Sequence, residues 1–180
     1  MRIISGIHRG KRIRPPGNFK ARPTTDFAKE SLFNILANHY DFEELDVLDL
    51  FSGTGSIAYE FVSRGARSVV AVELLQPHFK FIQDTGKALA MEQLTPIRTD
   101  AFRYLKKPYQ SFDVIFADPP YDHPGLEQLP DLVISTTILA DGGIFILEHP
   151  GSYDFSAHQG FSQHRKYGGV NFTMFTKNPA

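Results

Sequence analysis

The sequence contains no cysteine and no run of 18 consecutive apolar residues. Without cysteine the chain can form neither a disulfide framework nor a thiolate metal site. Its seven histidines are scattered, with no His-x-x-x-His or similar ligand pair, so we expect no metal site. The missing apolar run argues against a transmembrane helix, and the N-terminus has no apolar stretch of the kind a signal peptide carries. We therefore expect a soluble, monomeric, cytoplasmic protein with no membrane partner.

A length of 180 residues suits one domain with a sizeable core. From residue 45 onward, apolar strand-like runs alternate with segments of helical periodicity, which predicts a parallel sheet with helices on both faces. The expected strands are 45–50, 68–72, 94–99, 112–117 and 143–148, with a closing hairpin of 161–167 and 170–176. The expected helices run from Thr24 or Thr25 to about residue 39, and over about 76–91, 101–107 and 125–137.

The net charge is −1, but the charges are distributed unevenly. Residues 1–25 hold seven Lys/Arg and no acid, whereas residues 26–180 carry a net charge of −8. Two short strand-like runs, 2–6 and 11–14, predict that the basic segment forms a β-hairpin. A basic arm on an acidic body is typical of a protein that binds phosphates. A solvated hairpin whose charges keep an edge strand from aggregating is the alternative.

The most informative stretch is Asp118-Pro119-Pro120-Tyr121, which directly follows the apolar run 112–117. Proline donates no backbone hydrogen bond, so the two prolines end the strand. They leave a rigid loop that presents one carboxylate, backbone carbonyls and one flat ring. These groups suit a planar amino-bearing molecule such as a nucleobase, because the oxygens accept its NH2 protons and the ring stacks on its face. For this tetrapeptide alone, a structural turn with a packed tyrosine is the alternative.

A glycine turn connects the strand-like run 45–50 to a helical pattern. Gly53 and Gly55 allow a tight turn and let a ligand approach the backbone near a helix N-terminus. With Ala58 in the third position, the spacing also fits a dinucleotide fingerprint, so the glycines alone do not separate NAD from other adenosine cofactors. Asp49 favours an adenosine cofactor other than NAD, because a carboxylate just before the glycines would repel a pyrophosphate and attract an ammonium or a sulfonium.

Two further acids follow later strands. Glu73 lies about 20 residues after the glycines, where an acid accepts hydrogen bonds from ribose hydroxyls. Asp100, followed by Ala101, ends the next strand and is placed to receive the exocyclic amine of an adenine. Each acid is weak support alone. Their joint order, one at the carboxyl end of each successive strand, predicts a ligand site along that edge of the sheet.

This order of motifs resembles the class I S-adenosylmethionine-dependent methyltransferases that act on amino groups. The segments 2–6, 22–26, 30–34 and 49–55 together resemble the RsmD family, which methylates the N2 amine of one guanine in bacterial 16S ribosomal RNA. The resemblance implies S-adenosylmethionine as cofactor and the small ribosomal subunit or an assembly intermediate as partner. It also implies a Rossmann-like α/β fold with a seven-stranded, mostly parallel sheet, divided into a basic hairpin (1–24) and a methyltransferase domain (25–180).

Functional roles follow from the motifs and the resemblance together. Asp118 and the Pro119 carbonyl are expected to accept the two amine protons, with Tyr121, or alternatively Phe51, stacked on the base; Pro120 completes the loop. The residues expected around the methyl donor are Asp49, Phe51, Gly53, Gly55, Glu73, Asp100, Ala101 and Thr25. Those expected to contact RNA are Arg9, Lys11, Arg12, Arg22 and Thr24.

Four other functions fit part of the pattern. A DNA adenine-N6 methyltransferase shares the DPPY loop and the glycine turn, but the gaps between these strands leave no room for a target-recognition insert. A glutamine-amide methyltransferase of release factors typically has Asn in place of Asp118. An NAD-dependent dehydrogenase leaves the DPPY loop without a role. A non-catalytic RNA-binding module predicts a damaged donor site, whereas every expected position is filled.

Overall fold

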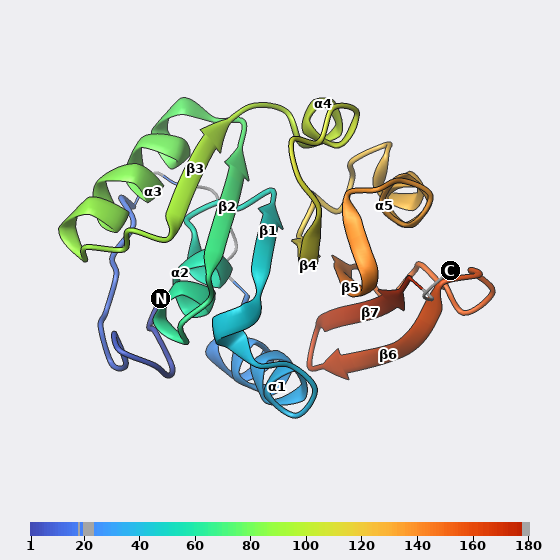
Figure 1. Ribbon diagram of the computed structural model, residues 1–180, viewed down its shortest axis with the longest axis horizontal. Coiled ribbons are helices and arrows are strands. Elements are labelled where there is room, and N and C mark those ends of the chain that lie inside the picture. The colour runs from blue at the N-terminus through green and yellow to red at the C-terminus, as the bar shows by residue number, and fades with distance from the viewer. Residues whose placement is uncertain (18, 20–23, 178–180) are drawn as a thin grey trace.

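The computed structural model describes residues 1–17, 19 and 24–177. One seven-stranded sheet runs through the molecule in the order β3-β2-β1-β4-β5-β7-β6 (Figure 1). Strands β1 to β5 are parallel, and β7 is antiparallel to both β5 and β6. The predicted mostly parallel sheet with its closing antiparallel hairpin is therefore confirmed. The strands are β1 (Asp46–Leu50), β2 (Ser68–Glu73), β3 (Leu94–Arg98), β4 (Phe112–Ala117), β5 (Leu139–His149), β6 (Phe161–Tyr167) and β7 (Val170–Thr176).

Helices cover both faces of the sheet, because successive residues of the buried strands point to opposite sides and both sides are apolar. On β1, Val47 packs into the core on one face and Leu48 into the core on the other. The first core contains side chains from α1 (Asp26–Ala37), α2 (Ser56–Ser63) and α3 (Gln76–Ala88). The second contains side chains from α4 (Ala101–Leu105) and α5 (Leu129–Ile134). No helix within the described ranges is long and apolar enough to cross a membrane.

The segment predicted as one helix over 125–137 is divided in the structure. The segment 125–137 forms a short 3-10 helix, η2 (Leu126–Gln128), followed by α5. Pro130 lies in the first turn of α5, where its missing N–H breaks no helical bond, so a new helix begins there. A further 3-10 turn, η1 (Phe42–Glu44), precedes β1.

Strand β5 begins four residues earlier than predicted, because the expected Asp-Gly-Gly turn is a bulge inside the strand. Gly142 adopts a φ of +75°, which favours glycine, and its N–H donates to the Lys177 carbonyl at 3.1 Å. The pairing with β4 shifts between Phe112 and Val114, as a bulge requires. The strand therefore continues through the glycines.

The antiparallel pairing of the predicted N-terminal hairpin is present, since the Ile3 N–H donates to the Lys11 carbonyl at 3.0 Å, but it is too short to form two strands. A single isolated bridge joins Arg2 to Arg12. The N–H groups of Ile4 and Ser5 instead donate to the carboxylate of Glu60 on α2, at 2.8 and 3.0 Å. The pairing therefore stops after Ile3, and the charged Glu60 carboxylate satisfies the next two N–H groups.

Close packing holds the same segment against α2. The Ile7 N–H donates to the Ser63 carbonyl at 2.8 Å. At Gly6, where φ is +81°, an added Cβ would lie 1.7 Å from that carbonyl oxygen, so no larger residue fits. Ile3 and Ile13 are buried in the core. The segment is thus docked on the domain and does not project as an arm, while its cations stay exposed: Arg2, Arg9, Lys11, Arg12 and Arg14.

Candidate active site

A cavity of about 990 Å³ opens at the carboxyl ends of the parallel strands. It lies where the order of the sheet reverses, between β1 and β4, which is where open α/β sheets bind ligands. Ligand sites usually measure about 300–1,000 Å³, so this cavity lies at the large end of that range. The predicted residues that line it are Thr24, Thr25, Asp49, Phe51, Gly53, Glu73, Asp100, Ala101, Asp118, Pro119, Pro120 and Tyr121.

The other predicted residues lie elsewhere. Arg9, Lys11 and Arg12 are exposed on the docked N-terminal segment, away from the lining of the cavity, and Arg22 falls outside the described residues. Gly55 begins α2 rather than lining the cavity.

The structure gives a steric reason for glycine at position 55. Its φ is +84°, and an added Cβ would lie 2.6 Å from the ring of Tyr59. The packing of α2 therefore favours glycine at position 55, and the approach of a ligand to its backbone stays a prediction.

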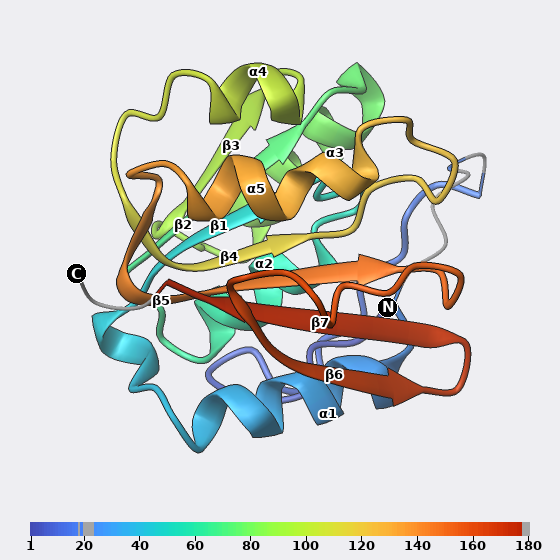
Figure 2. The same cartoon turned by 90° about the vertical axis from the view of Figure 1, so that its right-hand side faces the viewer.

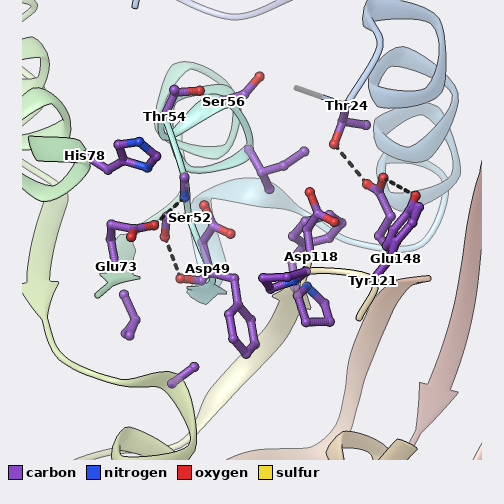
Figure 3. Close-up of a pocket in the computed structure, with 18 of the residues that line it drawn as sticks. Thr24, Asp49, Ser52, Thr54, Ser56, Glu73, His78, Asp118, Tyr121 and Glu148 are labelled. Atoms are coloured by element: carbon purple, nitrogen blue, oxygen red, sulfur yellow. Dashed lines mark hydrogen bonds between the residues drawn. The ribbon is translucent and has the colours of Figure 1, made fainter. Parts of the chain in front are cut away.

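Glu73 connects the glycine turn to the next loop. Its Oε2 accepts the Gly53 N–H and its Oε1 accepts the Leu75 N–H, each at 2.8 Å. Figure 3 shows its carboxylate at the edge of the cavity, near His78. An ionised carboxylate offers about four acceptor positions, so Glu73 can hold two hydroxyl groups of a ligand while keeping both backbone bonds.

Two other lining residues begin helices. Thr25 is the N-cap of α1 and its hydroxyl accepts the Ala28 N–H at 3.2 Å. Asp100 is the N-cap of α4, where its Oδ1 accepts the Arg103 N–H at 2.9 Å. Such caps fix the side chains at the start of a helix, so both oxygens sit at defined positions in the cavity wall.

Three acids form one wall of the cavity, at the ends of β1, β4 and β5. Figure 3 shows Asp118 between Asp49 and Glu148. Burial raises the pKa of Asp49 to about 8, with a smaller contribution from the charge of Glu73. Burial also raises the pKa of Asp118 well above its ordinary value, and the charges of Glu148 and Asp49 add to this effect. A cation in the cavity would stabilise the ionised form of these acids.

Asp49 has a buried oxygen that can accept a hydrogen bond from a ligand. Its side chain is 1% exposed, and its Oδ2 has no hydrogen-bond partner among the described residues. A buried polar atom without a partner is costly, so a donor supplied by a ligand would offset that cost.

Glu148 is a lining residue that the sequence analysis missed. It accepts a hydrogen bond from the Thr24 hydroxyl at 2.9 Å and another from the Tyr121 hydroxyl at 3.4 Å (Figure 3). It thereby connects the residues before α1 to the DPPY loop. The signal was present, because Glu148 is an acid at the carboxyl end of a strand, as Asp49 and Asp118 are.

The two aromatic candidates for stacking differ in environment. Phe51 adopts a φ of +58°, and its ring contacts those of Phe102 and His123 edge-to-face, with centroids 6.1 and 5.9 Å apart. Left-handed backbone at a non-glycine residue costs about 1–3 kcal/mol. The surrounding structure therefore keeps Phe51 in a backbone conformation that a phenylalanine disfavours. Tyr121 is 39% exposed at the cavity, which leaves ring surface accessible. Other lining residues that the sequence analysis did not single out include Phe27, Leu74, Leu75, His78, Thr99, His123 and Tyr167.

Comparison with known proteins gives one family and several relatives. The profile of the family described as Conserved hypothetical protein 95 matches residues 1–176. The "Ribosomal RNA small subunit methyltransferase D" of Buchnera aphidicola subsp. Baizongia pistaciae is 33% identical over 148 residues, covering 82% of this chain and 75% of that protein. The protein of the same name from Haemophilus influenzae is 32% identical over 152 residues, covering 82% and 78%.

Solved structures share the fold. The yhhF protein of Escherichia coli superposes with a TM-score of 0.87 at 26% identity, covering 100% of this chain and 99% of that chain. An RNA methyltransferase from Salinibacter ruber, in complex with S-adenosyl-L-homocysteine, has a TM-score of 0.70 at 15% identity, covering 88% and 95%. At that identity the second likeness concerns the fold alone.

Proposed function

This chain belongs to the Conserved hypothetical protein 95 family, and we propose that it transfers a methyl group from S-adenosylmethionine to the N2 amine of a guanine in 16S ribosomal RNA. The observation that carries the proposal is the DPPY loop, residues 118–121, set against an acidic cavity at the switch point of the sheet. The name of the relatives supports the choice of substrate.

The described residues fit the donor. The unpartnered oxygen of Asp49 suits the ammonium or the sulfonium of its amino-acid part. Glu73 is placed for the ribose hydroxyls, and Asp100 for the exocyclic amine of the adenine. When bound, S-adenosylmethionine supplies a methyl group that is already activated, so the protein's contribution is positioning and charge stabilisation.

The DPPY loop supplies what the acceptor needs. The exocyclic amine of guanine is a poor nucleophile, because its lone pair is delocalised into the ring. The Asp118 carboxylate and the Pro119 carbonyl each accept one N–H, which favours a pyramidal nitrogen with a localised lone pair. Tyr121 stacks on the base, a contact worth roughly 1–3 kcal/mol. The target must be flipped out or single-stranded to enter the cavity.

Asp118 also has the properties of a base for the proton that the amine loses. The pKa of its carboxyl is raised by burial and by the charges of Glu148 and Asp49, so its ionised form binds a proton more tightly than an ordinary aspartate does. Glu148 holds the Tyr121 hydroxyl and thereby orients the stacking ring.

The proposal is tested by labelled methyl transfer. Purified protein, S-adenosylmethionine with a labelled methyl group and small ribosomal subunits that lack the modification should give N2-methylguanosine after nuclease digestion. Labelled N6-methyladenosine would support the adenine methyltransferase instead, and NAD binding with no methyl transfer would support the dehydrogenase.

Replacing Glu73 by alanine should weaken S-adenosylmethionine binding by roughly 1–3 kcal/mol, because the ribose hydroxyls lose a charged acceptor. Calorimetric titration of the wild-type protein and of Glu73→Ala measures the difference, with NAD titrated in parallel. Glu92→Ala removes an exposed acid outside the cavity lining and should bind like wild type. Equal affinity in all three proteins would show that Glu73 does not contact the donor.

The exposed cations Arg9, Lys11 and Arg12 should carry RNA affinity. Reversing all three to glutamate should raise the dissociation constant for RNA and flatten its salt dependence, by about 0.9 units of slope for each phosphate that is no longer neutralised. The donor affinity should not change, because these residues lie outside the cavity lining. Filter binding over a range of salt concentrations measures the slope.

A second triple reversal serves as the control. Lys87, Lys106 and Lys107 are exposed on α3 and just after α4, so reversing them changes the net charge by the same amount. If both triple variants flattened the slope equally, the effect would come from net charge, and the N-terminal segment would have no specific part in RNA binding.

A further inference from the structure

Phe27 and Tyr167 line the cavity in addition to Phe51, Phe116 and Tyr121. Phe27, in the first turn of α1, and Tyr167, at the end of β6, meet edge-to-face with ring centroids 5.9 Å apart and planes at 84°. Both views of the fold place β6 next to α1 (Figures 1 and 2). Phe27 is 67% exposed, although it is apolar. An exposed ring that borders a ligand cavity points to a binding role.

The turn after Tyr167 leaves space in front of these rings. Gly168 and Gly169 both line the cavity. At Gly169 an added Cβ would meet no atom within 4 Å, and its φ lies outside the left-handed region. The fold therefore does not require glycine at position 169, and the missing side chain keeps this part of the cavity open.

Positive charge lies on the same strand. Arg165 and Lys166 are exposed on β6, directly before Tyr167. Arg165 is two residues from Tyr167, so its side chain points to the same face of the strand. Within the described part of the chain neither cation forms an ion pair. Free cations beside an exposed aromatic surface are the combination that binds single-stranded nucleic acid.

We propose that Phe27, Tyr167 and the open space at Gly169 form a second base-binding subsite, which stacks a nucleobase next to the target guanine in the RNA strand. Arg165, on the same face of β6 as Tyr167, contacts the phosphates of that segment. This inference rests on the proposed function. Moving the target base out of its stack leaves its neighbours without a stacking partner, and the Phe27 ring replaces that partner at the mouth of the same cavity.

The test measures the dissociation constant of a 16S ribosomal RNA fragment that contains the target guanine. Phe27→Ala should raise it about 5- to 150-fold, the range for the loss of one base–aromatic stack. Phe27→Leu keeps apolar surface but loses the flat ring and should also bind weakly, whereas Phe27→Trp should bind like wild type. Tyr109→Ala is the matched control, because Tyr109 is 87% exposed and lies outside the cavity lining.

A second RNA tests whether Phe27 contacts a base next to the target guanine. In a fragment with abasic sites on both sides of the target, wild type and Phe27→Ala should bind equally, because the stacked base is absent. Tyr167→Ala should behave like Phe27→Ala, with thermal unfolding as a check, because Tyr167 also contacts Phe172 in the core. S-adenosylmethionine affinity should be the same in every variant.

The outcomes separate this inference from the proposed function. If wild type methylates the RNA but Phe27→Ala binds the intact fragment as tightly as wild type does, the subsite is wrong and the proposed function stands. The subsite is equally wrong if Phe27→Ala weakens binding of the intact and the abasic fragments alike. If wild type methylates no guanine, the proposed function itself fails.

Discussion

Replacing Asp118 by alanine is expected to lower kcat for methyl transfer by about 10²- to 10⁴-fold, the usual contribution of a positioned proton acceptor. The carboxyl directly follows β4 and lies in the cavity wall between Asp49 and Glu148 (Figure 3). Because the role proposed for Asp118 concerns the guanine amine, the dissociation constant of S-adenosylmethionine should change much less than kcat. Single-turnover rates with excess enzyme measure the chemical step directly.

Two further variants sharpen this prediction. Asp118→Asn keeps one acceptor oxygen but cannot bind the proton, so its rate should lie between those of wild type and Asp118→Ala. Asp122→Ala removes an exposed acid four residues away that does not line the cavity, and its rate should match wild type. Methylation by Asp118→Ala at the wild-type rate would rule out the amine-clamping role of the DPPY loop.

Replacing Asp49 by asparagine should weaken S-adenosylmethionine binding by about 2–5 kcal/mol, the cost of removing one partner from a buried charge pair. The pKa of about 8 adds a pH dependence. Only the ionised carboxyl attracts the cation, so wild-type affinity should rise with pH up to about 8, by as much as tenfold per unit. The affinity of Asp49→Asn should not follow this profile. Calorimetry from pH 6 to 9 compares the two proteins.

The same carboxyl should make the free protein less stable as the pH rises. Its pKa is raised from 3.8 in the unfolded chain to about 8 in the fold, so between these values the folded state binds more protons. The free energy of unfolding must therefore fall with rising pH across that window. The Tm of Asp49→Asn minus that of wild type should therefore increase as the pH rises towards 8.

A control at the other end of β1 separates an effect at the cavity from a general effect of removing an acid from this strand. Asp46 opens β1 and its pKa is lowered by its hydrogen bond to Arg67, so Asp46→Asn should leave S-adenosylmethionine affinity unchanged. Wild-type affinity and an unchanged pH profile in Asp49→Asn would contradict the role given to Asp49.

The sheet and most acids of the cavity lining could be predicted because they depend on local patterns. Apolar runs that end in an acid mark the carboxyl ends of the strands, and parallel strands bring those ends to one edge. Asp49, Glu73, Asp100 and Asp118 therefore line one cavity, although up to 69 residues separate them. Glu148 follows the same rule and could have been included.

What could not be predicted depends on partners distant in sequence. The hairpin pairing of the basic segment is short because Glu60, 56 residues after Ile4, accepts the next backbone N–H groups, and no local pattern predicts that acceptor. The contact between Phe27 and Tyr167 joins a helix to a strand near the other end of the chain, so only the assembled fold reveals it.

Mass mapping of modified nucleotides in 16S ribosomal RNA tests the central claim most directly. The RNA is taken from four strains: cells with the gene, cells in which the gene is deleted, and deletion cells that express either the wild-type protein or Asp118→Ala. We expect one guanine to carry an N2 methyl group in the first, to lose it on deletion, and to regain it with wild type but not with Asp118→Ala. An identical set of modified nucleotides in all four RNAs would contradict the account.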